Sequence, residues 1–303
     1  MTALILHSQQ AVSSWHAHHR HPGGKGMAMR HHRAGLALSA LFWATASQAA
    51  PAGCAEFGGD GQLPVLTNEA LGQQTVLLCN DAFAVLHSGI SHGPLWTAEH
   101  LTEEDLERSM QIGRVVRFFH ADPRLTFEDR AELSDYRASD YDRGHMACSG
   151  DEPSLQAQEQ SFSLANVVPQ TPELNEGIWT GVEMAVRRLA QREGELYVVT
   201  GPAFGASVKT IGSHRVFVPS ATWKAVYDPA KDEAGAYFCQ NSSQPTCTII
   251  SIGALTQATG VNPFPSLPDE IRQTAMQLPR PLKSPYAVRI RPASGSPVLE
   301  TTP

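Results

Sequence analysis

The chain has 303 residues, of which 42% are hydrophobic and 17% charged, and its formal net charge is −7. This composition is typical of an ordinary globular protein with enough apolar residues for a large core. The excess of acidic residues argues against a protein that coats DNA through a broad basic surface, although it is compatible with an enzyme that has one local basic groove.

The N-terminal part has the pattern of a targeting segment. Residues 29–33 are basic, Ala34–Ala46 is a short apolar run, and Ser47–Ala49 supplies small residues before a cleavage point. We therefore predict a signal peptide at residues 29–49 and an exported protein, either periplasmic or secreted. Residues 1–28 are interpreted as an upstream over-extension of the reading frame, with a His-rich metal-binding tract as the alternative.

Removal of this segment makes the charge balance more acidic. Residues 1–49 contain four Lys or Arg and no Asp or Glu, so 19 basic and 30 acidic residues remain, a net charge of −11. The apolar run is too short to span a bilayer, and no later segment approaches that length.

Cysteine usage agrees with an oxidising compartment. Cys239 and Cys247 flank a turn and suit a short disulfide-closed loop, and Cys54 could be tied to Cys79, although sequence does not fix connectivity. Cys54 could instead be a lipidation site. Cys148 is left over, and it is either a small buried filler or a catalytic thiol.

The remaining chain predicts one α+β domain over residues 50–291, followed by a loose tail at 292–303. Thr102 and the acidic residues after it predict a helix start, because early carboxylates suit the helix dipole. The segments at 216–218 and 223–227 are expected to be neighbouring strands with one packed face. The other predicted strands are Val76–Leu78, Ala82–Leu86, Leu196–Thr200 and Thr248–Ile252.

The stretch from Ser161 to Glu193 predicts a strand followed by a helix. Phe162–Val168 is the expected strand, and Pro169 ends it. Thr171 is a suitable N-cap, with Pro172 at the first helical position. The apolar residues at helical spacing are Leu174, Ile178, Val182, Val186 and Leu189.

The segment Tyr141–Gly150 is the most informative motif of the chain. If it forms a strand, Arg143 and His145 point to the same side. Hydrolysis of a phosphodiester uses such a pair, because an imidazole can take a proton from water and a guanidinium can hold a phosphate oxygen. Gly144 between them leaves room for a close approach by another group.

Three residues of the predicted helix extend this site. Asn175 lies in the first turn, and its carboxamide oxygen is a hard ligand suited to Mg²⁺, although a plain polar residue is the simpler interpretation. Glu183 lies two turns further, beside the apolar stripe, where it can order metal-bound water. Trp179 is expected to pack in the core rather than to stack on bases.

Together these residues resemble the DNA/RNA non-specific endonucleases, the sugar-nonspecific branch of the ββα-metal nucleases. The resemblance covers most of the chain after the leader, from Leu78 to Pro268. The family usually has Pro where this chain has Cys148. The residues that carry the resemblance are Asp142, Arg143, Gly144, His145, Asn166, Pro169, Gln170, Asn175, Trp179 and Glu183.

The resemblance implies an α+β fold in which a ββα-metal (His-Me finger) core lies on a mostly antiparallel central sheet flanked by helices. It implies that His145 is the general base and that Asn175 is the direct protein ligand of a hydrated Mg²⁺, with Mn²⁺ as a substitute. Glu183 would hold water around the metal, and Asn166 would orient the site.

A further arginine is implied by the family pattern, in which an Arg before an Asp-Pro pair stabilises charge on the phosphate. Arg117 precedes Asp122-Pro123 and is the first candidate for this role, with Arg114 as the alternative. The predicted catalytic set is therefore His145, Arg143, Arg117, Asn166 and Glu183, with Asn175 as the metal ligand.

The implied function is an exported Mg²⁺-dependent endonuclease that cuts DNA and RNA and leaves 5′-phosphate ends. Contacts with the nucleic-acid backbone carry no base information, so little sequence preference is expected. The alternatives are a catalytically silent nuclease-fold module that binds nucleic acid or a protein, and an unrelated secreted binding protein. An inhibitor protein is a conceivable partner of an exported nuclease, although no residue indicates one.

Overall fold

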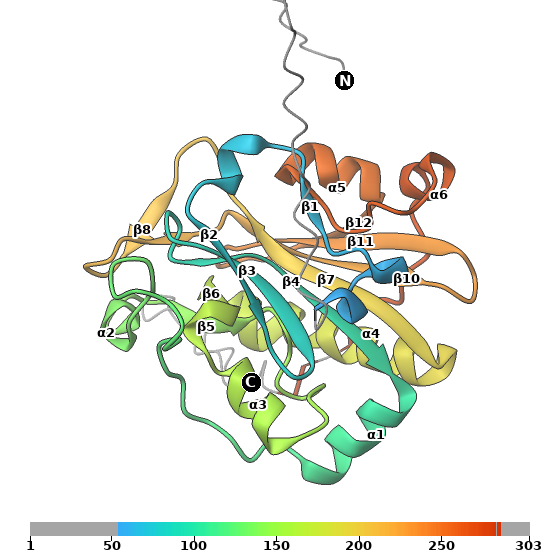
Figure 1. The fold of residues 1–303 in the computed structure, drawn as a ribbon, viewed down its shortest axis with the longest axis horizontal. Helices are drawn as coiled ribbons and strands as arrows, with labels where there is room; N and C mark the ends of the chain where they lie inside the picture. Colours follow the sequence, from blue (N-terminus) through green and yellow to red (C-terminus); the bar gives the residue numbers. More distant parts are fainter. Residues whose placement is uncertain (1–53, 283, 286–303) are drawn as a thin grey trace, which may run out of the picture. The chain divides into compact units, whose positions relative to one another are not determined.

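The computed structural model describes residues 54–282, 284 and 285. The predicted leader at 29–49, the stretch 1–28 and the tail at 292–303 lie outside the described residues. The largest element is a seven-stranded antiparallel sheet with the strand order β12-β11-β10-β7-β4-β3-β2 (Figure 1). Its strands are β2 (Thr75–Cys79), β3 (Phe83–Ser88), β4 (Gly93–Thr102), β7 (Glu195–Ala203), β10 (Ala221–Asp228), β11 (Glu233–Gln240) and β12 (Cys247–Ile250).

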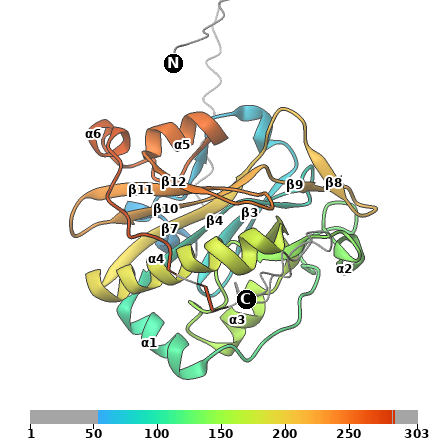
Figure 2. The same ribbon diagram turned by 180° about the vertical axis from the view of Figure 1, so that it is seen from behind.

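Helices cover both faces of this sheet. The helices α5 (Ile252–Thr259) and α6 (Asp269–Gln273) lie on one face (Figures 1 and 2). The other face is covered by α1 (Glu103–Ile112), α3 (Leu155–Ser161) and α4 (Thr180–Glu193). The predicted α+β class with a mostly antiparallel, helix-flanked sheet is therefore confirmed. Shorter helices are α2 (Leu133–Tyr136) and the 3₁₀ turns η1 (Ala55–Phe57), η2 (Gly59–Gly61), η3 (Glu69–Gly72) and η4 (Leu164–Asn166).

The central strand β10 shows why the sheet needs cover on both sides. Trp223, Ala225 and Tyr227 pack in one hydrophobic cluster with residues of α5, whereas Val226 packs in another with residues of α4. Successive side chains of a strand point to opposite faces. All eight residues of β10 are buried as a result, and the expectation that this segment has only one packed face is wrong.

A separate pair of strands forms the ββα unit. β5 (Asp142–His145) pairs antiparallel with β6 (Val167–Gln170), so that His145 lies opposite Val167. The chain then enters a π-helix, η5 (Glu173–Trp179), which continues as α4. The other two-stranded pairs are β1 (Val65–Leu66) with β13 (Val261–Asn262) and β8 (Lys209–Ile211) with β9 (Val216–Val218).

Several local predictions are confirmed. The segments at 76–78 and 196–200 belong to β2 and β7, and the segment predicted at 82–86 belongs to β3 from Phe83 onward. Thr102 caps α1, because its hydroxyl accepts a hydrogen bond from the Asp105 amide at 3.1 Å. Disulfides join Cys54 to Cys79 and Cys239 to Cys247, and Cys148 is a buried free thiol.

The predicted strand at 162–168 is wrong except at its last two residues. α3 ends at Ser161, and the turn η4 precedes β6, which begins only at Val167. The hydroxyl of Ser163 accepts a hydrogen bond from the Ala165 amide at 3.2 Å, and this local bond favours a turn over a strand. Pro169 lies inside β6 rather than ending it, which the two-stranded pair tolerates because each strand keeps one free edge.

Two other strand predictions are also corrected. The segment predicted at 248–252 ends as a strand at Ile250, because Ser251 caps α5 by accepting a hydrogen bond from the Ala254 amide at 3.2 Å. β9 pairs with β8 and not with β10, whose two neighbours are β7 and β11. The predicted adjacency of 216–218 and 223–227 is therefore wrong.

Candidate active site

A cavity of about 450 Å³ brings the predicted site residues together. Asn166 is the one predicted site residue that is not in its lining. The predicted residues that line the cavity are Arg117, Arg143, His145, Asn175 and Glu183. The other lining residues are Arg114, Phe119, Asp142, Cys148, Ser149, Phe162, Glu176 and Thr180.

His145 lies at the end of β5 between two phenyl rings. Its ring centroid is 5.0 Å from that of Phe119 and 4.8 Å from that of Phe162, and the residue is 8% exposed. Burial, followed by the positive charges of Arg114 and Arg143, lowers the pKa of His145 to about 3. The imidazole is therefore neutral at neutral pH. Its buried Nε2 has no hydrogen-bond partner among the described residues, so the arrangement suits a base that accepts a proton.

Three arginines surround this imidazole. The Cζ atom of Arg143 lies 4.8 Å from the centroid of the Phe119 ring, and that of Arg114 lies 5.4 Å from the Phe162 centroid. Arg117 also lines the cavity. None of the three forms an ion pair within the part of the chain that the structure describes. Their charges are therefore not neutralised by these residues and can bind a phosphate.

The helix that carries Asn175 begins as predicted. Pro172 is the first helical residue, and the Thr171 hydroxyl caps the helix by accepting a hydrogen bond from the Leu174 amide at 3.3 Å. Gly177 has non-helical torsion angles and interrupts the helix between η5 and α4. Such single π turns in a helix frequently occur at functional sites, because they redirect the side chains around them.

Asn175 is held by a carboxylate from the neighbouring strand. Its Nδ2 donates a hydrogen bond to Asp142 Oδ2 at 3.0 Å, which leaves the carboxamide oxygen as the atom available to a cation. Glu183 is half-buried in the same cavity, and burial raises its pKa, while Lys224, Arg187 and Arg114 oppose that shift. Oxygen atoms from an amide and a carboxylate fit a hard cation such as Mg²⁺.

This donor set fits a largely hydrated ion rather than a fully enclosed one. Within residues 54–285, residue 283 aside, no group of three or more His, Cys, Asp or Glu side chains is arranged to hold a metal ion. Mg²⁺ keeps several of its waters and is commonly bound through one or two protein oxygens. Asn175 as the direct ligand and Glu183 as a hydrogen-bond acceptor for metal-bound water are consistent with that preference.

Asn166 lies in the core next to the site and does not line the cavity. The side chain is fully buried, and its Oδ1 accepts hydrogen bonds from the Ala147 amide at 2.9 Å and the Thr97 hydroxyl at 3.2 Å. Its Nδ2 donates to the carbonyls of Ala147 at 3.0 Å and Ser161 at 2.9 Å. Asn166 therefore fixes the chain just after His145, and it is a positioning residue rather than a group that reaches the cavity.

Gly144 is required by the packing of Gln170. A Cβ atom at position 144 would lie 2.0 Å from Gln170 Oε1 and 2.3 Å from its Cδ. The Gln170 side chain is fully buried and donates to the Thr222 hydroxyl at 3.2 Å, so it has little room to move. The predicted close approach at Gly144 is thus made by this side chain.

Replacement of Gly144 by Ala is expected to lower the free energy of unfolding by about 1–3 kcal/mol, because the added methyl overpacks a buried contact. Urea denaturation followed by circular dichroism measures this change. Gly205→Ala is the matched control, since its added Cβ would meet only Ser220 atoms at 3.8 Å. Equal stability of the two variants would contradict the packing argument.

Some features of the site have no clear signal in the sequence. Phe119 and Phe162 form the walls around His145, but nothing in their local patterns sets them apart from core residues. Cys148 is 8% exposed, and its Sγ accepts a hydrogen bond from Arg187 Nη2 at 3.3 Å. Burial raises the pKa of the Cys148 thiol, which supports the small buried filler over the catalytic thiol.

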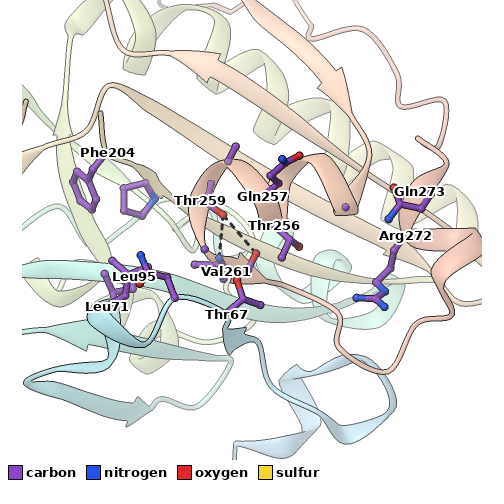
Figure 3. A pocket seen from close by; sticks show the side chains of 15 residues that line it. Thr67, Leu71, Leu95, Phe204, Thr256, Gln257, Thr259, Val261, Arg272 and Gln273 are labelled. Carbon is purple, nitrogen blue, oxygen red and sulfur yellow. Dashed lines mark hydrogen bonds between the residues drawn. The ribbon is translucent and has the colours of Figure 1, made fainter. Parts of the chain in front are cut away.

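A second cavity, of about 570 Å³, is bordered by α5 and α6 (Figure 3). Arg272 is the only charged side chain among the described residues that line it, and the rest are apolar or neutral polar, such as Leu71, Phe204 and Gln257. It has no His, Asp or Glu that could exchange a proton with a substrate. Of these two cavities, the one around His145, which groups the motif residues, is the candidate for catalysis.

Comparisons with known proteins agree with this site. The family model described as DNA/RNA non-specific endonuclease matches residues 62–270, more than half of the chain. The chain is 32% identical over 202 residues to a mitochondrial endonuclease G from Bos taurus, covering 63% of this chain and 64% of that protein. It is 34% identical over 153 residues to nuclease C1 from Cunninghamella echinulata, covering 47% and 61%.

A solved structure of an EndoG/EndoGI complex matches with a TM-score of 0.57 and 25% sequence identity, over 61% of this chain and 84% of that chain. The match to a mitochondrial nuclease EXOG from Danio rerio is 32% identical over 195 residues, covering 57% of this chain and 56% of that protein. The matched region thus spans less than two thirds of the length of these three nucleases.

The two disulfides are typical of a non-cytosolic protein, and two of the three nucleases above are named as mitochondrial. In the part of the chain that the structure describes, no helix has the length and apolar character needed to cross a bilayer. Two findings identify the family of this chain: the family model matches residues 62–270, and the motif residues line one cavity. The chain belongs to the DNA/RNA non-specific endonuclease family.

Proposed function

We propose that this protein is a Mg²⁺-dependent endonuclease that hydrolyses the phosphodiester bonds of DNA and RNA. The observation that carries the proposal is the neutral imidazole of His145, which lines a cavity together with three arginines that have no ion-pair partner among the described residues. A general base and fixed positive charges are the two components that phosphodiester hydrolysis requires.

His145 removes a proton from a water molecule through its Nε2 atom, and that water attacks phosphorus in line. Arg143 and Arg114 bind the non-bridging oxygens and stabilise the charge that develops there. Arg114 is preferred over Arg117 for the contact nearest the base, because its charge acts on the pKa of both His145 and Glu183. Arg117, which lines the same cavity, is a further phosphate contact.

Asn175 and Glu183 would hold the cation. The carboxamide oxygen of Asn175 would be the direct ligand, because Asp142 accepts a hydrogen bond from the amide nitrogen and so turns it away from that role. Glu183 would accept hydrogen bonds from the water around the cation. When bound, Mg²⁺ supplies positive charge that stabilises the departing 3′ oxygen.

This mechanism predicts broad substrate use. Because water is the nucleophile, the ribose 2′-OH takes no part, and both DNA and RNA are substrates. Binding through backbone phosphates gives little sequence preference. Departure of the 3′ oxygen leaves products with 5′-phosphate ends.

The proposed location is outside the cytoplasm, by export to the periplasm or the medium. The disulfides Cys54–Cys79 and Cys239–Cys247 support an oxidising compartment. An inhibitor protein is proposed as a partner, since the similar structure is that of an EndoG/EndoGI complex.

The purified protein, incubated with supercoiled plasmid and with total RNA, tests the proposal. We expect degradation of both substrates with Mg²⁺ and of neither with EDTA, and 5′-phosphate ends on the products. A protein that shifts DNA on a gel but cuts neither substrate under any divalent cation would instead be the catalytically silent module.

A further inference from the structure

An exposed aromatic residue stands between two residues that line the catalytic cavity. Phe118 is 85% exposed, the largest value among the exposed large hydrophobic residues in the described part of the chain. Its neighbours in sequence, Arg117 and Phe119, both line the cavity that holds His145. A single exposed hydrophobic side chain is ordinary on a protein surface, so it is the position of Phe118 between two cavity residues that indicates a ligand contact.

The loop that carries Phe118 is fixed on its N-terminal side. The buried side chain of Gln158 accepts hydrogen bonds through Oε1 from the amides of Val115 at 2.8 Å and Val116 at 2.7 Å. Its Nε2 donates to the carbonyl of Gly113 at 2.9 Å. One buried amide therefore holds three consecutive peptide units before Arg117.

The loop is also fixed on its C-terminal side. The Phe119 ring packs against Phe162 with centroids 4.8 Å apart. The His120 amide donates to the Phe162 carbonyl at 3.2 Å, and the Leu164 amide donates to the His120 carbonyl at 2.8 Å. Phe118 is thus presented by a segment with both ends attached to the core, and its exposure follows from the backbone path.

From this geometry we propose that Phe118 stacks on a nucleobase of the strand whose phosphate occupies the cavity. The inference rests on the proposed nuclease function. A nucleic-acid strand is the occupant because Arg114 and Arg117, on the same loop, line the cavity and have no ion pair in the described chain. Bases of all four kinds have a π face, so a phenyl ring adds affinity without adding sequence preference.

Stacking would also add binding affinity that the net negative charge of this protein does not oppose. With 30 acidic and 23 basic residues, the chain as a whole repels a polyanion. Affinity from a few arginines alone would fall steeply with salt. A stacking contact does not depend on counterion release, and it would keep a single strand bound beside the base His145 at higher ionic strength.

The variant Phe118→Ala tests this inference. Its affinity for a single-stranded oligonucleotide that contains 2-aminopurine is measured in EDTA, so that no cleavage occurs. Stacking contributes about 1–3 kcal/mol per base, which corresponds to a loss of affinity of about 5- to 150-fold. The fluorescence quenching that accompanies stacking of 2-aminopurine on the wild type should be lost together with the affinity. Phe118→Trp should restore both, whereas Phe118→Leu should not.

Phe127→Ala is the matched control, because Phe127 is also exposed, at 57%, but its neighbours in sequence, unlike those of Phe118, do not line the cavity. Hydrolysis of bis(p-nitrophenyl) phosphate with Mg²⁺, a diester with no nucleobase, separates the chemistry from the base contact. We expect Phe118→Ala to hydrolyse this diester at the wild-type rate while it cuts single-stranded DNA with a raised KM.

Three results would overturn the inference. Unchanged affinity in Phe118→Ala, with cleavage intact in the wild type, would exclude stacking while leaving the nuclease function in place. Full recovery by Phe118→Leu would mean a simple apolar contact. A wild-type dimer that Phe118→Ala converts to a monomer, in analytical ultracentrifugation, would assign the ring to a contact between copies of the chain. By contrast, a wild type that cuts neither DNA nor the diester would refute the proposed function itself.

Discussion

Replacement of His145 by Ala is expected to lower kcat for plasmid and RNA cleavage by about 10²–10⁴-fold, the usual effect of losing a general base. The buried imidazole is the only His among the described residues that line the cavity, and it is neutral at neutral pH because burial and the charges of two arginines lower its pKa. KM should change little, because a neutral ring contributes no charge to phosphate binding. Steady-state cleavage of a fluorescent oligonucleotide measures both parameters.

Two controls separate a chemical effect from a structural one. Removal of the ring leaves a gap between Phe119 and Phe162, so thermal unfolding of His145→Ala must be compared with that of the wild type. Imidazole added to the solution should restore part of the activity, because it can occupy this gap and accept the proton. Activity that stays within a few-fold of the wild type would exclude His145 as the base.

The residues of the site that sequence could predict lie in two local patterns. Arg143 and His145 are two residues apart in β5, and Asn175 and Glu183 lie on one helix after the Thr171 cap. Each pattern depends only on neighbouring residues and on the period of a strand or a helix. Their grouping around one cavity joins two separate elements, and the resemblance to the family implied it, not either local pattern.

The parts that could not be predicted depend on contacts distant in sequence. Lys224 is buried in β10, where its Nζ donates to Thr200 Oγ1 at 2.6 Å and to the Met146 carbonyl at 3.3 Å. It lies 3.7 Å from the buried carboxylate of Glu99, so its charge is compensated inside the sheet. A lysine in a strand normally predicts an exposed face, and nothing near Lys224 in sequence indicates these partners.

The interruption of the helix at Gly177 could not be predicted from the sequence either. Gly177 interrupts the helix between Asn175 and Glu183, although the apolar spacing on both sides of it is that of one continuous helix. The Ser284 hydroxyl, 108 residues later in the sequence, donates a hydrogen bond to the Glu176 carbonyl. The Leu282 amide donates to the Gly181 carbonyl at 2.9 Å. Contacts of this kind between remote segments influence the local helix geometry around Asn175, and a single sequence gives no signal for them.

Asn175→Ala is expected to raise the Mg²⁺ concentration needed for half-maximal cleavage by at least about 10- to 100-fold, the range found when even an indirect partner of a metal is lost. The carboxamide oxygen of Asn175 is the proposed direct ligand, and no cluster of three acidic, His or Cys side chains among the described residues offers a replacement. Isothermal titration of Mn²⁺ into the protein without substrate gives a readout that does not depend on turnover.

Glu176→Gln is the matched control for this prediction, because Glu176 lines the same cavity one residue away and has no proposed role with the metal. It should leave the Mg²⁺ titration within about two-fold of the wild type, since ligation by a single oxygen depends on that atom far more than on a nearby charge.

Asn175→Asp keeps an oxygen at the ligand position but places a second carboxylate beside Asp142. In the wild type, Asp142 accepts a hydrogen bond from the Asn175 amide at 3.0 Å. That variant should bind the cation and yet position it less well, so metal affinity is retained while kcat falls. An Mg²⁺ titration of Asn175→Ala that matches that of Glu176→Gln would show that the cation is held elsewhere, and Asn175 would then serve only to orient Asp142.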